Sequence, residues 1–179
     1  ALAARFDTED SYNKAANSAR ISIAHPEFQN HIKAFIIKCK DNNIQIQINS
    51  TYRTKAEQAE LIRKHQAKKA AGKSSIAPST KSYHLVGMAF DFNPTVNGKK
   101  ILSTKPKADW INSKVPAIGK SLGLEWGGNW KSPYDPIHFD FRHTVNFSVK
   151  NKMITQAYST PNLEATQIPT STYVTTKPT

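Results

Sequence analysis

Cysteine is almost absent from this chain of 179 residues, since Cys39 stands alone. One cysteine excludes an internal disulfide and a multi-cysteine metal site, and it is compatible with synthesis in the cytoplasm. Cys39 follows Phe28, Ile32 and Phe35 at helical spacing, which predicts a buried core thiol. Nothing nearby in the sequence suggests a base that would activate it as a nucleophile.

Long apolar runs are also missing, so no segment is expected to cross a membrane. Residues 1–5 are too short and lack the apolar centre of a signal peptide. The chain begins without Met, which indicates a processed product or a fragment. No internal repeat is evident, so binding modules built from repeats are excluded.

Acidic residues are few, with 13 against 25 basic ones, and the formal net charge is +12. This balance predicts an anionic partner, either nucleic acid or a surface of phosphate-rich polymers or lipids. The chain has no nucleic-acid-binding motif and no interleaving of aromatic and basic residues, so nucleic acid is not expected. Several lysines follow one predicted helix and its exit, namely Lys64, Lys68, Lys69 and Lys73.

Two alternating segments carry the residues with catalytic chemistry. From residue 88 to 93, large apolar side chains alternate with small or polar ones, so Asp91 projects from the face opposite a core. The alternation from 137 to 142 places His138 opposite its apolar neighbours in the same way. If the two strands share a sheet, Asp91 and His138 lie on one polar face, and His84 precedes the first strand closely enough to reach that face.

These residues have the composition of a catalytic zinc site. His84, Asp91 and His138 supply three ligands and leave a position open for water, while Asp135 supplies a carboxylate that can act as general base. Each residue alone has an ordinary alternative as a polar or ion-paired side chain, but three coincidences of spacing and strand face favour the metal site. The other histidines are expected to be ordinary polar residues: His25, His31, His65 and His143.

The predicted fold is α+β, a small antiparallel sheet with helices packed on one face and the zinc site on the other. The expected elements are a helix opened by His25-Pro26 and ended by 41–43, a strand over 44–48, a helix from the capping box at Thr54 to about 71, a hairpin turn at Asn97-Gly98, and a helix over 110–122 with Pro116 in its first turn or at a kink. We expect three regions: an N-terminal segment (1–24) with a short helix over about 10–19, the zinc-site domain (25–150), and a Thr- and Pro-rich tail (151–179).

The paired patterns are Ser82-x-His84-x-x-Gly87-x-Ala89-x-Asp91, then Trp126-Gly127-Gly128-x-Trp130 and Asp135-x-x-His138-Phe139. Together they resemble the zinc peptidases of bacterial cell walls, a group of D-alanyl-D-alanine carboxypeptidases, D,D-dipeptidases and L-alanyl-D-glutamate endopeptidases. This group shares its metal-site fold with the hedgehog signalling domain. The Trp-Gly-Gly-x-Trp run and the aspartate before the last histidine are most similar to the L-alanyl-D-glutamate branch, which includes many phage endolysins.

The resemblance implies a role for each residue. It makes His84, Asp91 and His138 the zinc ligands, Asp135 the catalytic carboxylate, Arg53 a group near the scissile carbonyl and Ser82 a substrate contact. Relatives often have Gly where this chain has Thr51, and Glu or Gln where it has Asp140, which is expected at most to support a ligand. Trp126 and Trp130 are candidates for lining the substrate cleft, although Trp126 is equally expected to cover the core.

The expected function is zinc-dependent hydrolysis of a peptidoglycan stem peptide at the L-alanyl-D-glutamate bond, by a phage endolysin or a virion-associated lysin. The alternatives are a D-alanyl-D-alanine carboxypeptidase and a non-catalytic zinc module of the wall or of a phage particle. The expected partners are peptidoglycan, anionic envelope polymers and, in the virion setting, phage particle proteins. The expected place of action is the bacterial wall, reached without a signal peptide.

Overall fold

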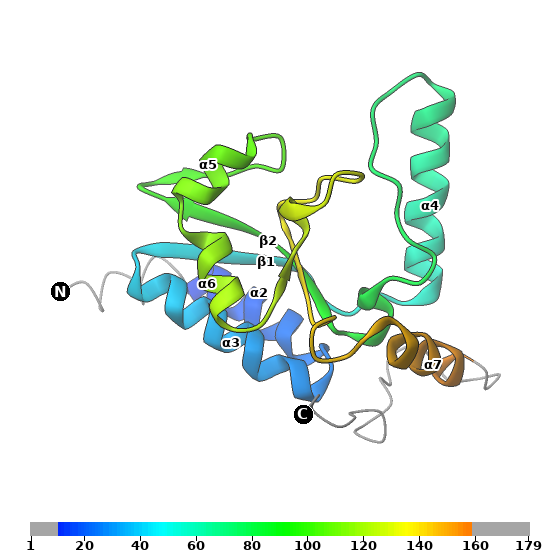
Figure 1. Cartoon of the computed structure of the whole chain (residues 1–179), viewed down its shortest axis with the longest axis horizontal. Coiled ribbons are helices and arrows are strands. Elements are labelled where there is room, and N and C mark those ends of the chain that lie inside the picture. The colour runs from blue at the N-terminus through cyan, green and yellow to red at the C-terminus, as the bar shows by residue number, and fades with distance from the viewer. Residues whose placement is uncertain (1–10, 159–179) are drawn as a thin grey trace.

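The computed structural model describes residues 11–158, which form a five-stranded antiparallel sheet with helices around it (Figure 1). The strands are ordered β1-β2-β5-β4, and β3 pairs with β2. The elements are α2 (Ser11–Ser22), α3 (Pro26–Asp41), β1 (Ile44–Ser50), α4 (Lys55–Ala70), η1 (Tyr83–Val86), β2 (Ala89–Val96), β3 (Lys99–Lys100), α5 (Lys107–Asn112), α6 (Val115–Ser121), β4 (Glu125–Trp126), η2 (Gly127–Asn129), β5 (His138–Asp140) and α7 (Phe147–Ala157).

The core lies between α3 and the sheet. The ring centre of Phe35 in α3 lies 5.3 Å from those of Phe90 and Phe92 and 5.1 Å from that of Phe139, in tilted or edge-on contacts. These three phenylalanines belong to β2 and β5 and are completely buried. They leave the opposite side-chain positions of both strands for Asp91 and His138, so the predicted α+β fold and its apolar face are confirmed.

Helix α2 packs on β1 through a buried amide. The Asn17 side chain donates to the carbonyl of Ile46 at 2.8 Å and accepts from the N–H of Ile48 at 2.8 Å. An exposed strand edge is thereby given hydrogen-bond partners, which protects it from pairing with another chain. The helix therefore belongs structurally to the sheet that follows it, although its residues lie before the expected boundary at 24.

Two turns show how backbone conformation confirmed or corrected the expected elements. Asn97 and Gly98 both have positive φ, 51° and 75°, as a two-residue hairpin requires, and they join β2 to β3. The helix expected over 110–122 is instead two helices, α5 and α6. Lys114 adopts φ 69° between them, which ends α5, and Pro116 lies in the first turn of α6, where its missing N–H is not needed.

The C-terminal part also differs in detail from the pattern. Strand β5 covers only three of the six alternating residues from 137 to 142, and the chain then turns, although Phe141 still reaches the core. Helix α7 continues past the expected boundary at Lys150 and ends at Ala157. Most of the predicted tail (151–179) and the first ten residues lie outside the described part of the chain.

Helix α4 stands away from the sheet at one side of the molecule (Figure 1). It begins as the capping box predicts, because the Thr54 hydroxyl accepts from the N–H of Glu57 at 3.0 Å. Gln58 is its only buried residue. Across residues 11–158, no helix combines the length and the hydropathy needed to cross a bilayer.

Candidate functional site

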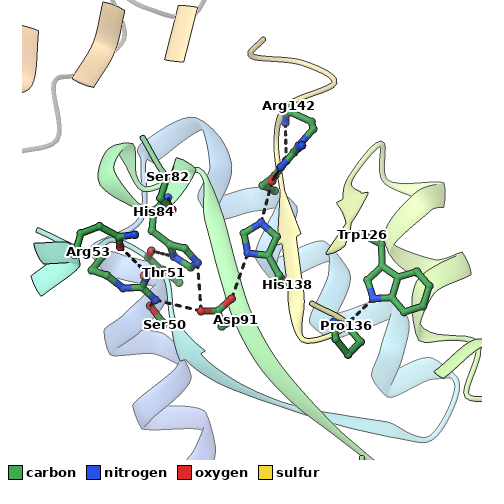
Figure 2. Close-up of polar contacts among 12 residues, drawn as sticks. Ser50, Thr51, Arg53, Ser82, His84, Asp91, Trp126, Pro136, His138 and Arg142 are labelled. Atoms are coloured by element: carbon green, nitrogen blue, oxygen red, sulfur yellow. Dashed lines mark hydrogen bonds and ion pairs between the residues drawn. The ribbon is translucent and has the colours of Figure 1, made fainter. Parts of the chain in front are cut away.

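The sheet register brings together the three residues predicted to bind metal. Asp91 of β2 and His138 of β5 are direct cross-strand neighbours, and His84 lies in η1 just before β2. Each offers one donor atom, and these atoms all lie within 4.8 Å of one another (Figure 2). The site is held by two strands and a short helical turn, which is a rigid support for ligands.

The turn that carries His84 is closed at both ends. The Ser82 hydroxyl accepts from the N–H of His84 at 3.1 Å and so caps the start of η1. Gly87 ends η1 with φ 68°, a conformation that a residue with a side chain rarely adopts, and the chain then enters β2. Ser82 therefore already has a positioning contact, and it also lines the cleft beside His84.

The ring of His84 is held by a backbone carbonyl. Its Nδ1 lies 2.6 Å from the oxygen of Thr51, and because a carbonyl only accepts, Nδ1 carries the proton. Nε2 therefore has a lone pair that is free to bind a metal, and it lies 3.3 Å from Oδ2 of Asp91. In the sequence Thr51 stands out only as a departure from relatives. In the structure its carbonyl orients a predicted ligand, as carbonyls behind metal-binding histidines do.

His138 has a carboxylate behind it. Its Nδ1 lies 3.3 Å from Oδ1 of Asp91, and its Nε2 lies 2.9 Å from Oδ2 of Asp140. Asp140 is fully buried and also accepts from Nε and Nη2 of Arg142 at 2.8 and 2.6 Å. This carboxylate fixes the ring and leaves Nδ1 facing Asp91, so Asp140 is tied to a predicted ligand more closely than the sequence led us to expect.

The charge state of the group suits a divalent cation. Burial alone would raise the pKa of Asp91, but His84 and His138 hold it well below the usual range, so the carboxylate is ionised. Burial would lower the pKa of His138, yet hydrogen bonds to Asp140 and Asp91 raise it to about 10 in the protein alone. Metal binding would displace that proton. Two imidazole nitrogens and one carboxylate oxygen fit Zn²⁺ and related divalent ions.

Arg53, which the family resemblance places near the scissile carbonyl, lies beside the His-Asp-His group. Its Nη2 lies 3.2 Å from Oδ2 of Asp91 and donates to Oγ of Ser50 at 3.2 Å. Its Nη1 donates to Oε1 of Gln58 at 2.9 Å, and the Gln58 amide donates in turn to the carbonyl of Ser79 at 2.6 Å. Gln58 was not singled out in the sequence, where nothing distinguished it from the other polar residues of its helix.

Asp135 lies in the same cleft, on the turn that leads into β5. Its N–H donates to the carbonyl of Gly127 at 3.0 Å, and its own carbonyl accepts from His138 at 3.3 Å. A Cβ at Gly127 would lie 2.3 Å from the oxygen of Asp135, so only glycine permits this approach. Burial raises the pKa of Asp135, and the charge of Asp91 raises it further, while His138 opposes the shift.

The two tryptophans divide between core and cleft. Trp126 is 5% exposed and its indole donates to the carbonyl of Pro136 at 2.8 Å, so it belongs to the core (Figure 2). Trp130 is half-buried, and its ring lies 5.0 Å from that of His138. The cleft has a volume of about 350 Å³ and contains Arg53, Ser82, Trp130, Asp135 and the three predicted ligands in its wall.

The other histidines lie apart from this group. His25 caps α3 through Nδ1 and is buried, and His31 packs its ring 4.6 Å from that of Phe141. His143 is exposed and pairs with Glu125 at 2.5 Å, so it is no rival ligand.

Comparison with known proteins agrees with this geometry. A family model described as D-alanyl-D-alanine carboxypeptidase matches residues 76–141. The chain is 35% identical over 108 residues to the L-alanyl-D-glutamate peptidase of Listeria phage A118, a match that covers 58% of this chain and 33% of the phage protein. It is 30% identical over 123 residues to the peptidoglycan L-alanyl-D-glutamate endopeptidase CwlK of Bacillus subtilis, covering 65% of this chain and 72% of CwlK.

A solved structure supports the fold. The vancomycin resistance D,D-pentapeptidase VanY, solved in complex with Zn(II), superposes with a TM-score of 0.51 at 16% identity, covering 75% of this chain and 79% of VanY. The chain spans about a third of the phage relative and most of CwlK. The segment that matches the family model includes every predicted ligand and Asp135. The chain therefore belongs to the D-alanyl-D-alanine carboxypeptidase family of metallopeptidases.

Proposed function

We propose that this protein hydrolyses the L-alanyl-D-glutamate bond of the peptidoglycan stem peptide, with zinc held by His84, Asp91 and His138. Both curated relatives are named for that activity. The observation that carries the proposal is the convergence of Asp135 and Arg53 on one cleft with the His-Asp-His group. A module that only binds would need neither a base nor a cation beside its metal.

Zinc, when bound, supplies Lewis acidity that polarises the scissile carbonyl and brings the pKa of water to about 7. The three residues fit it because one oxygen and two nitrogens converge from a rigid frame, with both rings oriented by the acceptors behind them. They leave one side of the site open to the cleft for water and substrate.

Asp135 is proposed as the general base and acid. It accepts the proton of the attacking water and delivers it to the leaving amine of D-glutamate, so the carboxylate ends the reaction ionised as it began. Its burial raises the pKa towards the range in which a carboxyl can both take and release a proton. The Gly127 contact holds the backbone beside this side chain in place.

Arg53 is proposed to stabilise the negative charge that develops on the scissile oxygen. Its guanidinium is fixed by Ser50, Gln58 and Asp91, so little reorganisation is needed when that charge appears. Arginine remains charged at any working pH, which suits this role.

Ser82 and Trp130 are proposed as substrate contacts. Ser82 keeps its cap to η1 while its oxygen can still donate its proton to a peptide carbonyl in the cleft. Trp130 offers a ring face next to His138, where the apolar part of a stem residue can pack. The peptidase unit is proposed to span residues 25–150, which include the first residues of α7, with α2 packed on it.

The setting is proposed to be the degradation of a bacterial wall by a phage endolysin or a virion-associated lysin, as the name of the phage relative suggests. The formal charge of +12 would favour approach to an anionic envelope. A D-alanyl-D-alanine carboxypeptidase is the second candidate, because the matching family model carries that description.

Mass spectrometry of purified peptidoglycan after incubation with the protein tests this proposal. Parallel samples would contain EDTA, EDTA followed by excess zinc, and the Asp135→Ala variant. New fragments that begin at D-glutamate, lost with EDTA and restored by zinc, are expected. Release of single D-alanine residues would instead assign the carboxypeptidase activity, and an unchanged wall with zinc-loaded protein would refute both.

A further inference from the structure

A buried lysine lies in the cleft and has no part in the proposed chemistry. Lys150 of α7 is 4% exposed, and its side chain lines the same cleft as Asp135 and His138. Its Nζ donates to the carbonyl of Lys81 at 2.6 Å and lies 4.9 Å from the ring centre of Tyr83. The ammonium is therefore held at the wall of the cleft and largely shielded from bulk water.

This ammonium forms no close ion pair among residues 14–158, although Asp140 attracts it at longer range. The nearest buried carboxylate, Asp140, already accepts from Arg142 through both oxygens and contacts His138. The single negative charge of Asp140 balances the positive charge of Arg142, so it does not also neutralise that of Lys150. Burying an ammonium without a close counter-charge is unfavourable. A neutral side chain at position 150 could donate the same hydrogen bond to the Lys81 carbonyl, so that bond alone does not explain why the residue is charged.

Arg142 and Lys150 both lie near the rings of Tyr83 and Phe147, and Arg142 contacts Asp140 behind His138. The guanidinium carbon lies 5.0 Å from the ring centre of Phe147, and the Lys150 ammonium lies 5.1 Å from the same ring. Arg142 also lies 4.5 Å from the Trp130 ring, and its Nη1 makes no hydrogen bond within the described residues. Arg142 and His138 both contact Asp140, and both cations line the cleft that holds the metal-binding group.

We propose that Lys150, with Arg142 beside it, binds a carboxylate carried by the substrate residue next to the scissile bond. This inference rests on the proposed peptidase function and names what that site selects. Glutamate has two carboxyl groups and only one continues the chain, so an L-alanyl-D-glutamate substrate presents a free carboxylate at this position. The terminal carboxylate of a shorter peptide has the same chemistry and is the other source of such a group.

Pairs of synthetic stem peptides test the proposal. One pair differs only in a free or amidated glutamate carboxylate, and a second pair only in a free or amidated chain terminus. A hydrogen bond to a charged group is worth about 1.5–3 kcal/mol, so wild type should favour the free glutamate form by about 10- to 100-fold in kcat/KM. Lys150→Met should reduce this ratio of kcat/KM values to near one, whereas Lys150→Arg should keep most of the wild-type ratio.

Lys152→Met is the matched control, since Lys152 is exposed on the same helix. It should keep the wild-type ratio, and thermal unfolding would verify that each variant folds. A ratio near one in wild type, or an unchanged ratio in Lys150→Met, would refute the proposal while leaving hydrolysis intact. Discrimination confined to the second pair would assign the site to a terminal carboxylate and overturn the glutamate assignment.

Failure of the function itself can be separated from failure of this inference. Binding of the same peptides to the zinc-loaded Asp135→Ala variant, measured by calorimetry, needs no turnover. Tighter binding of the free carboxylate form, lost when Lys150→Met is added, would support the anion site even if no peptide were cleaved. Equal binding of both forms would contradict it.

Discussion

Replacing Asp140 with asparagine should weaken zinc binding without touching any predicted ligand. Asp140 is fully buried and fixes the His138 ring through Nε2 at 2.9 Å while it binds two nitrogens of Arg142. Asn has nearly the same shape but one oxygen in place of two. Its amide group must therefore face a donor on either His138 or Arg142, and the negative charge behind the imidazole is lost.

The size of the effect follows from that geometry. A lost hydrogen bond between charged groups costs about 1.5–3 kcal/mol. Removing the partner behind a metal-binding histidine typically lowers metal affinity by about 10- to 100-fold. Both figures point to a zinc dissociation constant about 10- to 100-fold higher in Asp140→Asn, with the metal still bound at saturating zinc.

Competition with a chromophoric chelator at pH 7.5 would measure this constant. Asp109→Asn is the matched control, because it removes the same charge from an exposed position on α5. Circular dichroism would verify that both variants are folded at the assay temperature. Equal zinc affinity in Asp140→Asn and wild type would refute the claim that this carboxylate supports a ligand.

Four further predictions concern the proposed base, a predicted ligand, a core glycine and the buried cysteine. Asp135→Ala should keep zinc but lower kcat by about 10²- to 10⁴-fold, whereas His84→Ala should lose both zinc and activity. Metal analysis beside a rate assay measures both effects, and a fully active Asp135→Ala variant would exclude Asp135 as the base. Gly119→Ala places a Cβ 2.2 Å from the Phe139 ring and should cost about 1–3 kcal/mol, a fall in Tm of several degrees; an unchanged Tm would contradict it. Burial raises the pKa of Cys39 to about 12, so the native thiol should resist alkylation at pH 8. The unfolded thiol ionises at pH ~8.5, so the free energy of unfolding should fall as the pH rises above that value. Alkylation of native protein as fast as that of unfolded protein would contradict this.

Strand alternation predicted the centre of the site well. It placed Asp91 and His138 on one face from the apolar residues between them, and the β2–β5 register makes them direct neighbours. The same parity places Asp140 on the face of His138, so its signal was present in the sequence. Its importance was not, because the contact depends on the ring orientation of His138 and on Arg142.

Other parts of the site had no local signal. The group that orients His84 is the backbone oxygen of Thr51, which any residue type could supply. Gln58 lies in the first turn of α4, five residues after Arg53, and their contact depends on the Arg53 side chain turning back to that helix. The composition changes at Lys150, which predicts the end of a domain there, whereas the burial of Lys150 depends on how α7 packs against η1.

The buried side-chain contacts of helix α4 lie in its first turn. Gln58 ties that turn to Arg53 and to the Ser79 carbonyl, and it is the only residue that the helix buries. Sixteen residues at about 1.5 Å each make a rod about 24 Å long. Residues 66–70 at its far end are all exposed and lie outside the cleft wall, so they can change in sequence without disturbing the metal-binding group. An engineer could graft a peptide tag or an affinity segment onto that distal end and keep the cleft intact.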